Sequence, residues 1–151
     1  MTRLSGEMRG GHHVLMVRVY YEDTDFSGVV YHASYLRFME RGRTDYLRQH
    51  GIDHRAMFEA TSADGAGFAF VVRGMQIEFI RPARMDDVLE IRTAPADVKG
   101  ASATLHQRVM RGGETLVEAN VRFACVAGGR PQRIPPALRD AMIADQMAAK
   151  R

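Results

Sequence analysis

Cysteine is almost absent from this sequence of 151 residues, in which Cys125 is the only one. A single cysteine excludes an intramolecular disulfide and a zinc site built on cysteine ligands. Cys125 lies in an apolar stretch, a setting typical of a buried and unreactive thiol.

A long apolar run is also missing. No stretch approaches the ~18 apolar residues of a membrane-spanning helix, so no membrane insertion is expected. Residues 1–13 lack the apolar core of a signal peptide. We therefore expect a cytoplasmic protein in which residues 1–11 form a flexible arm and residues 12–151 form a single domain.

Charge of one sign does not dominate. The sequence has 21 Lys and Arg against 18 Asp and Glu, a net charge of +3, with acidic residues interspersed throughout. This balance does not predict a nucleic-acid partner. The glycine patterns of phosphate and dinucleotide sites are absent, as is the G-x-S-x-G pattern of serine hydrolases.

The hydrophobic pattern predicts an α+β domain. One long amphipathic helix is expected over residues 35–50, with Ser34 as its N-cap and Gly51 just beyond its end. Gly42 inside this helix indicates that another part of the backbone passes close by. Shorter helices are expected over residues 53–60 and 137–149. The β-rich runs predict a five-stranded antiparallel sheet that curves around the long helix, with strands over residues 12–22, 68–79, 88–93, 101–110 and 115–126.

The densest polar cluster lies between the first strand and the long helix, over residues 21–32. It holds three carboxylates, from Glu22, Asp23 and Asp25, together with His32. The start of a helix offers free N–H groups that can stabilise an oxyanion, and a nearby carboxylate can act as a general base or nucleophile. These are the ingredients of acyl-transfer hydrolysis. A polar turn that only caps the helix fits the same residues.

Metal binding is disfavoured by the spacing of the ligands. Asp23, Asp25 and Ser27 resemble the opening of a calcium-binding EF-hand loop, but the twelfth position is Ser34 rather than the required glutamate. The six histidines are scattered along the chain. We therefore expect no metal site.

Residues 20–36, which read YYEDTDFSGVVYHASYL, closely resemble the signature of a known enzyme family. The family is that of the Tol–Pal-associated acyl-CoA thioesterases of the YbgC type, relatives of 4-hydroxybenzoyl-CoA thioesterase in the hotdog-fold superfamily. The resemblance continues in residues 40–44, 70–73 and 81–87, and it covers roughly residues 14–136.

The resemblance implies a hotdog fold, a curved antiparallel sheet around one long helix, in a homodimer or homotetramer with active sites at the dimer interface. It also implies hydrolysis of an acyl-CoA thioester to free CoA and a carboxylic acid. Asp25 takes the place of the catalytic aspartate, and Tyr21 and His32 take the places of its helpers. No cofactor is implied, because coenzyme A is part of the substrate. Phe26 and Ser27 stand where close relatives often have small residues.

A second reading remains open beside the enzymatic one. The same fold could act as a scaffold that binds acyl carrier protein or envelope-associated partners, with little or no turnover. The combination of Tyr21, Asp25 and His32 favours the enzyme, because a scaffold has no need of it.

Overall fold

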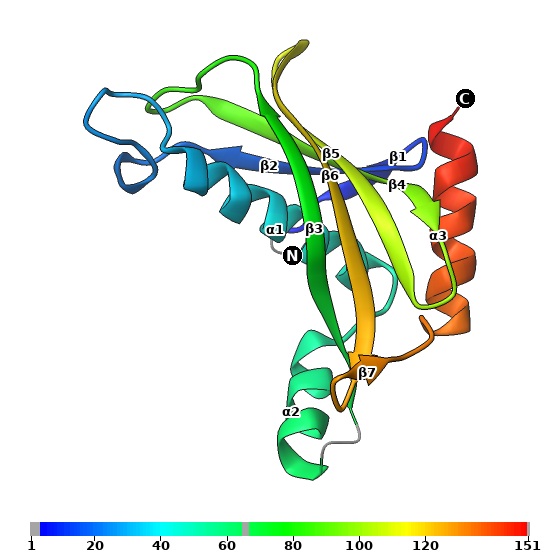
Figure 1. Cartoon of the computed structure of the whole chain (residues 1–151). Helices are drawn as coiled ribbons and strands as arrows, with labels where there is room; N and C mark the ends of the chain where they lie inside the picture. The colour runs from blue at the N-terminus through cyan, green and yellow to red at the C-terminus, as the bar shows by residue number, and fades with distance from the viewer. Residues whose placement is uncertain (1–3, 65–66, 151) are drawn as a thin grey trace.

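The computed structural model describes residues 4–64 and 67–150 and contains one antiparallel sheet. Neighbouring strands follow the order β1-β2-β4-β5-β6-β3, and β7 also pairs with β6 (Figure 1). The strands are β1 (Glu7–Arg9), β2 (His12–Arg18), β3 (Ala69–Phe79), β4 (Val88–Val98), β5 (Ser102–Arg111), β6 (Glu114–Ala127) and β7 (Arg130–Pro131). The helices are α1 (His32–Gln49), α2 (His54–Asp64) and α3 (Pro136–Ala149).

The α+β class and the curved antiparallel sheet against one long helix are confirmed, but the sheet has seven strands rather than five. The five long strands are the predicted ones, and the short β1 and β7 are the additions. β1 lies within residues 1–11, which were expected to be a loose arm, and its residues pair with β2. Gly10 and Gly11 both have positive φ and make the tight turn between these two strands.

Two strand boundaries also differ from the predicted ones. β2 ends at Arg18, four residues early, because Tyr21–Asp23 forms a short 3₁₀ helix instead. β4 runs five residues further than predicted, through Pro95, with a bulge in its pairing with β5 between Pro95 and Asp97. A bulge is one of the places where a sheet tolerates proline.

Helix α1 packs against β2, β4 and β5. It begins at His32 with Tyr31 as its N-cap, so the predicted N-cap at Ser34 is wrong. Gly51 follows the helix with φ of +89°, as expected. A methyl group on Gly42 would lie 2.8 Å from Ile91 Cγ2 and 3.2 Å from Thr93 Oγ1. Side chains of the sheet, and not another backbone, therefore explain this glycine.

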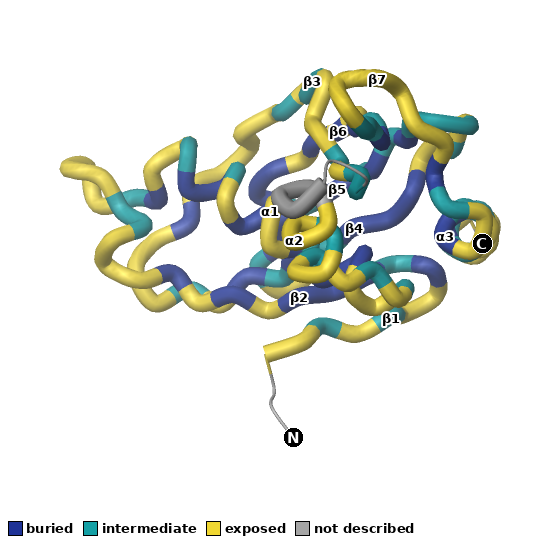
Figure 2. The backbone as a smooth tube through the Cα atoms, turned by 90° about the horizontal axis from the view of Figure 1, so that it is seen from below, coloured by how far each residue is buried: buried dark blue, intermediate teal, exposed yellow. Residues whose placement is uncertain are grey.

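The core lies between α1 and the sheet, where the buried segments of the chain gather (Figure 2). Near the start of α1 it includes Tyr35, Phe38 and Met39, which pack with residues of β2, β4, β5 and β6. A second cluster joins the end of α1 to α3 through Tyr46 and Leu138. The first cluster includes Val19 and Val30, which lie at the two ends of the polar loop between β2 and α1.

A buried polar contact ties the N-terminal segment to α1. Asp45 Oδ2 accepts a hydrogen bond of 2.7 Å from the Gly6 N–H and lies 2.7 Å from His13 Nε2. Burial alone would raise the pKa of Asp45, but these contacts hold it below its ordinary value. None of the helices in the described ranges has both the length and the apolar character needed to cross a membrane.

Candidate active site

The polar loop between β2 and α1 is held by its own hydrogen bonds. Asp23 Oδ2 accepts a bond of 2.8 Å from the Tyr20 N–H, and the Asp23 carbonyl accepts one of 2.8 Å from the Tyr31 N–H. The Thr24 hydroxyl donates to the Tyr21 carbonyl at 2.7 Å. Asp23 therefore has a structural role: it folds the loop back toward the start of the helix.

Asp25 lies on a tight turn at the exposed tip of this loop. The Gly28 N–H donates to the Asp25 carbonyl at 3.1 Å, and Gly28 adopts φ of +85°, a conformation that favours glycine. Asp25 Oδ1 accepts hydrogen bonds from the Ser27 hydroxyl at 2.6 Å and the Ser27 N–H at 2.8 Å. These bonds, the hydroxyl one first, hold the pKa of Asp25 below its ordinary value. The carboxylate is therefore ionised at neutral pH.

Helix α1 begins seven residues after Asp25, and its first turn carries no side-chain cap. The first N–H groups of a helix have no partner within it, and they carry a partial positive charge. In this turn the Ser34 N–H is bonded to the Tyr31 carbonyl at 2.8 Å, while His32 and Ala33 open the helix. Their N–H groups are suited to bind the oxygen of a carbonyl that gains charge.

His32 and Tyr21 lie near this region without bonding to Asp25. The exposed His32 ring contacts the ring of Tyr31 at a centroid distance of 4.5 Å and that of Phe79 at 6.2 Å. The Tyr21 side chain is 82% exposed. Within the described residues, neither side chain has a hydrogen bond to Asp25. The single chain thus brings His32 to the helix start and leaves Tyr21 facing solvent.

A small cavity of about 250 Å³ lies beside the start of α1. It is lined by residues around the helix start, the last residue of β3 and the segment that follows it, namely Val30, His32, Tyr35, Phe79, Ile80, Arg81 and Pro82. The walls are mainly apolar. Asp25 does not line the cavity.

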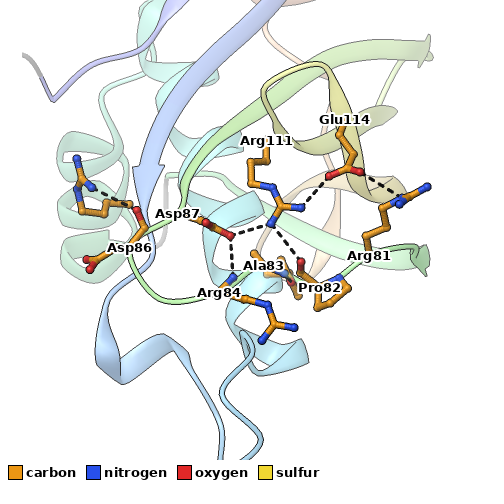
Figure 3. Close-up of polar contacts among 10 residues, drawn as sticks. Arg81, Pro82, Ala83, Arg84, Asp86, Asp87, Arg111 and Glu114 are labelled. Atoms are coloured by element: carbon orange, nitrogen blue, oxygen red, sulfur yellow. Dashed lines mark hydrogen bonds and ion pairs between the residues drawn. The ribbon is translucent and has the colours of Figure 1, made fainter.

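Residues 81–87 form a segment beside the cavity, and hydrogen bonds fix its position. The Ala83 N–H donates to the buried Tyr35 hydroxyl oxygen at 2.9 Å, and the Ala83 carbonyl accepts a bond of 2.9 Å from the Val30 N–H. Arg111 fixes the same segment, because its guanidinium lies 2.8 Å from Asp87 and 2.7 Å from Glu114 (Figure 3).

Sequence reasoning did not identify Tyr35, Ala83, Arg111 or Ser27 as parts of this site. Tyr35 meets Ala83 across 48 residues of chain and Arg111 meets Asp87 across 24, and no local pattern marks these contacts. Ser27 was detectable, because a serine two residues after an aspartate is a common hydrogen-bonded turn. Among the described residues, no group of three or more His, Cys, Asp or Glu could hold a metal ion.

Comparison with known proteins identifies similar sequences. Residues 19–142 match the family model of the thioesterase-like superfamily. The chain is 48% identical over 111 residues to the acyl-CoA thioester hydrolase YbgC of Escherichia coli, covering 73% of this chain and 78% of that protein. It is 45% identical over 114 residues to the acyl-CoA thioesterase YbgC of Haemophilus influenzae, covering 76% and 80% of the two chains.

Solved structures resemble the fold as a whole. A probable thioesterase from Bartonella henselae is 43% identical, with a TM-score of 0.76, and covers 82% of this chain and 99% of its own. A 1,4-dihydroxy-2-naphthoyl-CoA thioesterase from Synechocystis has a TM-score of 0.78 at 18% identity and covers 87% and 96% of the two chains. The second likeness concerns the fold alone. Together they identify the curved sheet around α1 as a hotdog fold.

Proposed function

The chain belongs to the thioesterase-like superfamily, and from this premise we propose that it is an acyl-CoA thioesterase. It hydrolyses the thioester to free coenzyme A and a carboxylic acid. One observation supports the proposal beyond family membership: an exposed carboxylate that Ser27 holds in its ionised form, on Asp25, and the uncapped start of α1, at His32, lie seven residues apart in one short segment. A base and an oxyanion-binding group are the two elements that thioester hydrolysis requires.

In the proposed mechanism Asp25 acts through Oδ2. Ser27 engages Oδ1 with two hydrogen bonds. As a general base, Oδ2 takes a proton from water while the water oxygen adds to the thioester carbonyl carbon. The tetrahedral intermediate then breaks its C–S bond, and the coenzyme A thiolate leaves and takes up a proton. As a nucleophile, Oδ2 would add to the same carbon, the C–S bond would break with release of the coenzyme A thiolate, and water would then hydrolyse the mixed anhydride to the carboxylic acid and the free Asp25 carboxylate.

The start of α1 supplies the oxyanion-binding groups of the proposed reaction. The N–H groups of His32 and Ala33 stabilise the carbonyl oxygen as it becomes an oxyanion. His32 lies in the wall of the small cavity and positions the thioester or the water. We assign Tyr21 a supporting hydrogen bond in the assembled site, because this residue is largely exposed in the single chain.

We further propose that the working unit is a homodimer joined through β3. This strand of 11 residues lies at one end of the sheet, so its outer edge is open in the single chain. Val72 and Phe79 on β3 and Ile80 beyond it are about half exposed, unusual for apolar side chains grouped on one edge. A partner strand there would cover them and shield the neighbouring site from water. Tol–Pal association and a cytoplasmic location stay predictions.

The test is release of thiol from short, long and aromatic acyl-CoA substrates by the full chain, with its mass in solution measured in parallel. We expect turnover on at least one substrate and a mass of two chains or more. A folded dimer that releases no thiol from any acyl-CoA would contradict the proposed function. That result would favour the scaffold role, with acyl carrier protein as the first partner to test.

A further inference from the structure

Arg111 joins two parts of the chain that are separate in the sequence. It is the last residue of β5 and pairs with Glu114, the first residue of β6. Its Nη2 donates to Glu114 Oε1 at 2.7 Å, and its Nη1 donates to Asp87 Oδ2 at 2.8 Å (Figure 3). The same Nη1 lies 3.4 Å from the Pro82 carbonyl oxygen. One guanidinium therefore connects the β5–β6 turn to the segment of residues 81–87.

The end of that segment has a strained backbone. Asp86 has φ of +69°, a left-handed conformation that costs free energy for a residue with a side chain. Asp87 closes the turn, because its Oδ2 accepts a hydrogen bond of 2.8 Å from the Arg84 N–H. Burial alone would raise the pKa of Asp87, but the Arg84 N–H and the Arg111 guanidinium hold it below its ordinary value. The ionised Asp87 side chain is thus the link between Arg111 and the turn.

This turn holds the first end of the polar loop, where the chain leaves β2. The Val19 N–H donates to the Asp87 carbonyl, and the Asp86 N–H donates to the Val19 carbonyl, both at 2.9 Å. Val19 is fully buried and belongs to the core beneath α1. Two backbone hydrogen bonds therefore fix this end of the loop to the turn that Arg111 contacts.

The same segment holds the second end of the loop and the first turns of α1. The Val30 N–H donates to the Ala83 carbonyl at 2.9 Å, and the Ala83 N–H donates to the Tyr35 hydroxyl oxygen at 2.9 Å. The loop that carries Asp25 and the helix start with its free N–H groups are therefore attached to one short segment. A displacement of that segment moves both.

We propose that Arg111 is a positioning residue for the proposed hydrolysis, on which this inference rests. Through Asp87 it holds the segment of residues 81–87, and this segment sets where the Asp25 loop and the start of α1 lie. Arg111 does not line the small cavity at the helix start, so we expect no contact with a thioester bound there. Its effect should fall on the transition state, which needs base and N–H groups in place, more than on substrate binding.

The test compares kcat and KM for thiol release by the full chain on the best acyl-CoA substrate of the wild type. Arg111→Gln should lower kcat about tenfold or more, the effect of a small misplacement of the reacting groups. Its KM should change by less than about threefold, since substrate contacts are kept. Arg111→Lys keeps the charge but not the planar fork, so it should recover part of the lost kcat.

Arg108→Gln is the matched control. It removes one positive charge from the same strand, and among the described residues Arg108 has no hydrogen bond or ion pair with residues 81–87. Its kcat should equal that of the wild type. Each rate is measured well below the unfolding temperature of the variant, so that loss of folded protein does not imitate a loss of kcat.

Asp87→Asn tests the path by which Arg111 acts. It keeps an oxygen for the Arg84 N–H and removes the ion pair with Arg111. Its kcat should fall by a factor similar to that of Arg111→Gln. The double variant should lose no more kcat than Arg111→Gln alone, because both changes break one contact. Asp87→Asn also decides the matter alone where Arg111→Gln does not fold.

Three results would overturn the proposal. The first is wild-type kcat in a folded Arg111→Gln or Asp87→Asn protein. The second is a rise in KM alone, which marks a residue that binds substrate. The third is a double variant in which the two losses multiply. A wild-type chain that releases no thiol would instead reject the proposed function, and this role with it, so the result for the wild type separates the two failures.

Discussion

Ser27 engages one oxygen of Asp25 with two donors, its hydroxyl at 2.6 Å and its backbone N–H at 2.8 Å from Oδ1. The contact orients an exposed carboxylate that no packing restrains. It also favours the ionised form, since both donors bond to the negative charge. Ser27 is thus a positioning residue for the proposed base.

Replacing the Ser27 hydroxyl should shift the pH dependence of the reaction. In Ser27→Ala the backbone donor remains and the hydroxyl donor is lost, so the pKa of Asp25 rises. Because the ionised form is active, the acidic limb of kcat/KM should move to higher pH. Ser27→Thr keeps a hydroxyl donor and should return the acidic limb to its wild-type position. Thr24→Ala removes a hydroxyl of the same loop that does not bond to Asp25. The acidic limb of its kcat/KM profile should stay at the wild-type pH. Identical profiles for Ser27→Ala and wild type would refute this role.

Tyr35→Phe should destabilise the protein through a single buried bond. The phenol oxygen accepts from the Ala83 N–H, and both residues are almost fully buried. Without it the N–H is left unsatisfied, at a cost of about 1–3 kcal/mol in the free energy of unfolding. Urea denaturation measures this change. Tyr31→Phe, on the exposed neighbour, should change it by less than about 0.5 kcal/mol. Equal changes in the free energy of unfolding for Tyr35→Phe and Tyr31→Phe would contradict this role of the Tyr35 hydroxyl.

Gly42→Ala should destabilise the protein although alanine favours helices. The new methyl group would lie 2.8 Å from Ile91 Cγ2, so the buried Ile91 side chain or the helix would have to shift. Overpacking of this kind costs about 1–3 kcal/mol, more than the ~1 kcal/mol gained in helix propensity. Gly100→Ala, where the methyl group would meet open space, should be nearly neutral. A thermal unfolding midpoint raised by Gly42→Ala would show that the contact relaxes freely.

Much of the fold could be predicted because its signals are local. Alternating apolar residues mark the long strands, and the Gly-Gly pair at 112–113 marks the turn between β5 and β6. The helix start was misplaced because Ser34 is a good N-cap residue, whereas Tyr31 caps without a side-chain bond. There tertiary contacts decide the boundary: the Val30 N–H bonds to the Ala83 carbonyl just before the helix.

The candidate site could be predicted only in part, because some of its contacts join segments that are far apart in the sequence. Asp25 and His32 lie seven residues apart in one continuous segment, so the sequence alone groups them. Tyr35 and Ala83 meet because the chain returns after β3, and no periodicity reveals that return. A cavity of about 510 Å³ lined by α1, α2 and β3 likewise exists only once these three elements are packed together.

The most direct measurement compares thiol release by Asp25→Asn and Asp23→Asn, each beside the wild type on its best acyl-CoA substrate. Both variants remove one negative charge from the same loop and keep an oxygen that can accept the existing hydrogen bonds. We predict that Asp25→Asn loses activity by about a thousandfold or more, while Asp23→Asn keeps about a tenth or more of it. Near-normal turnover by a folded Asp25→Asn protein would contradict Asp25 as the catalytic carboxylate.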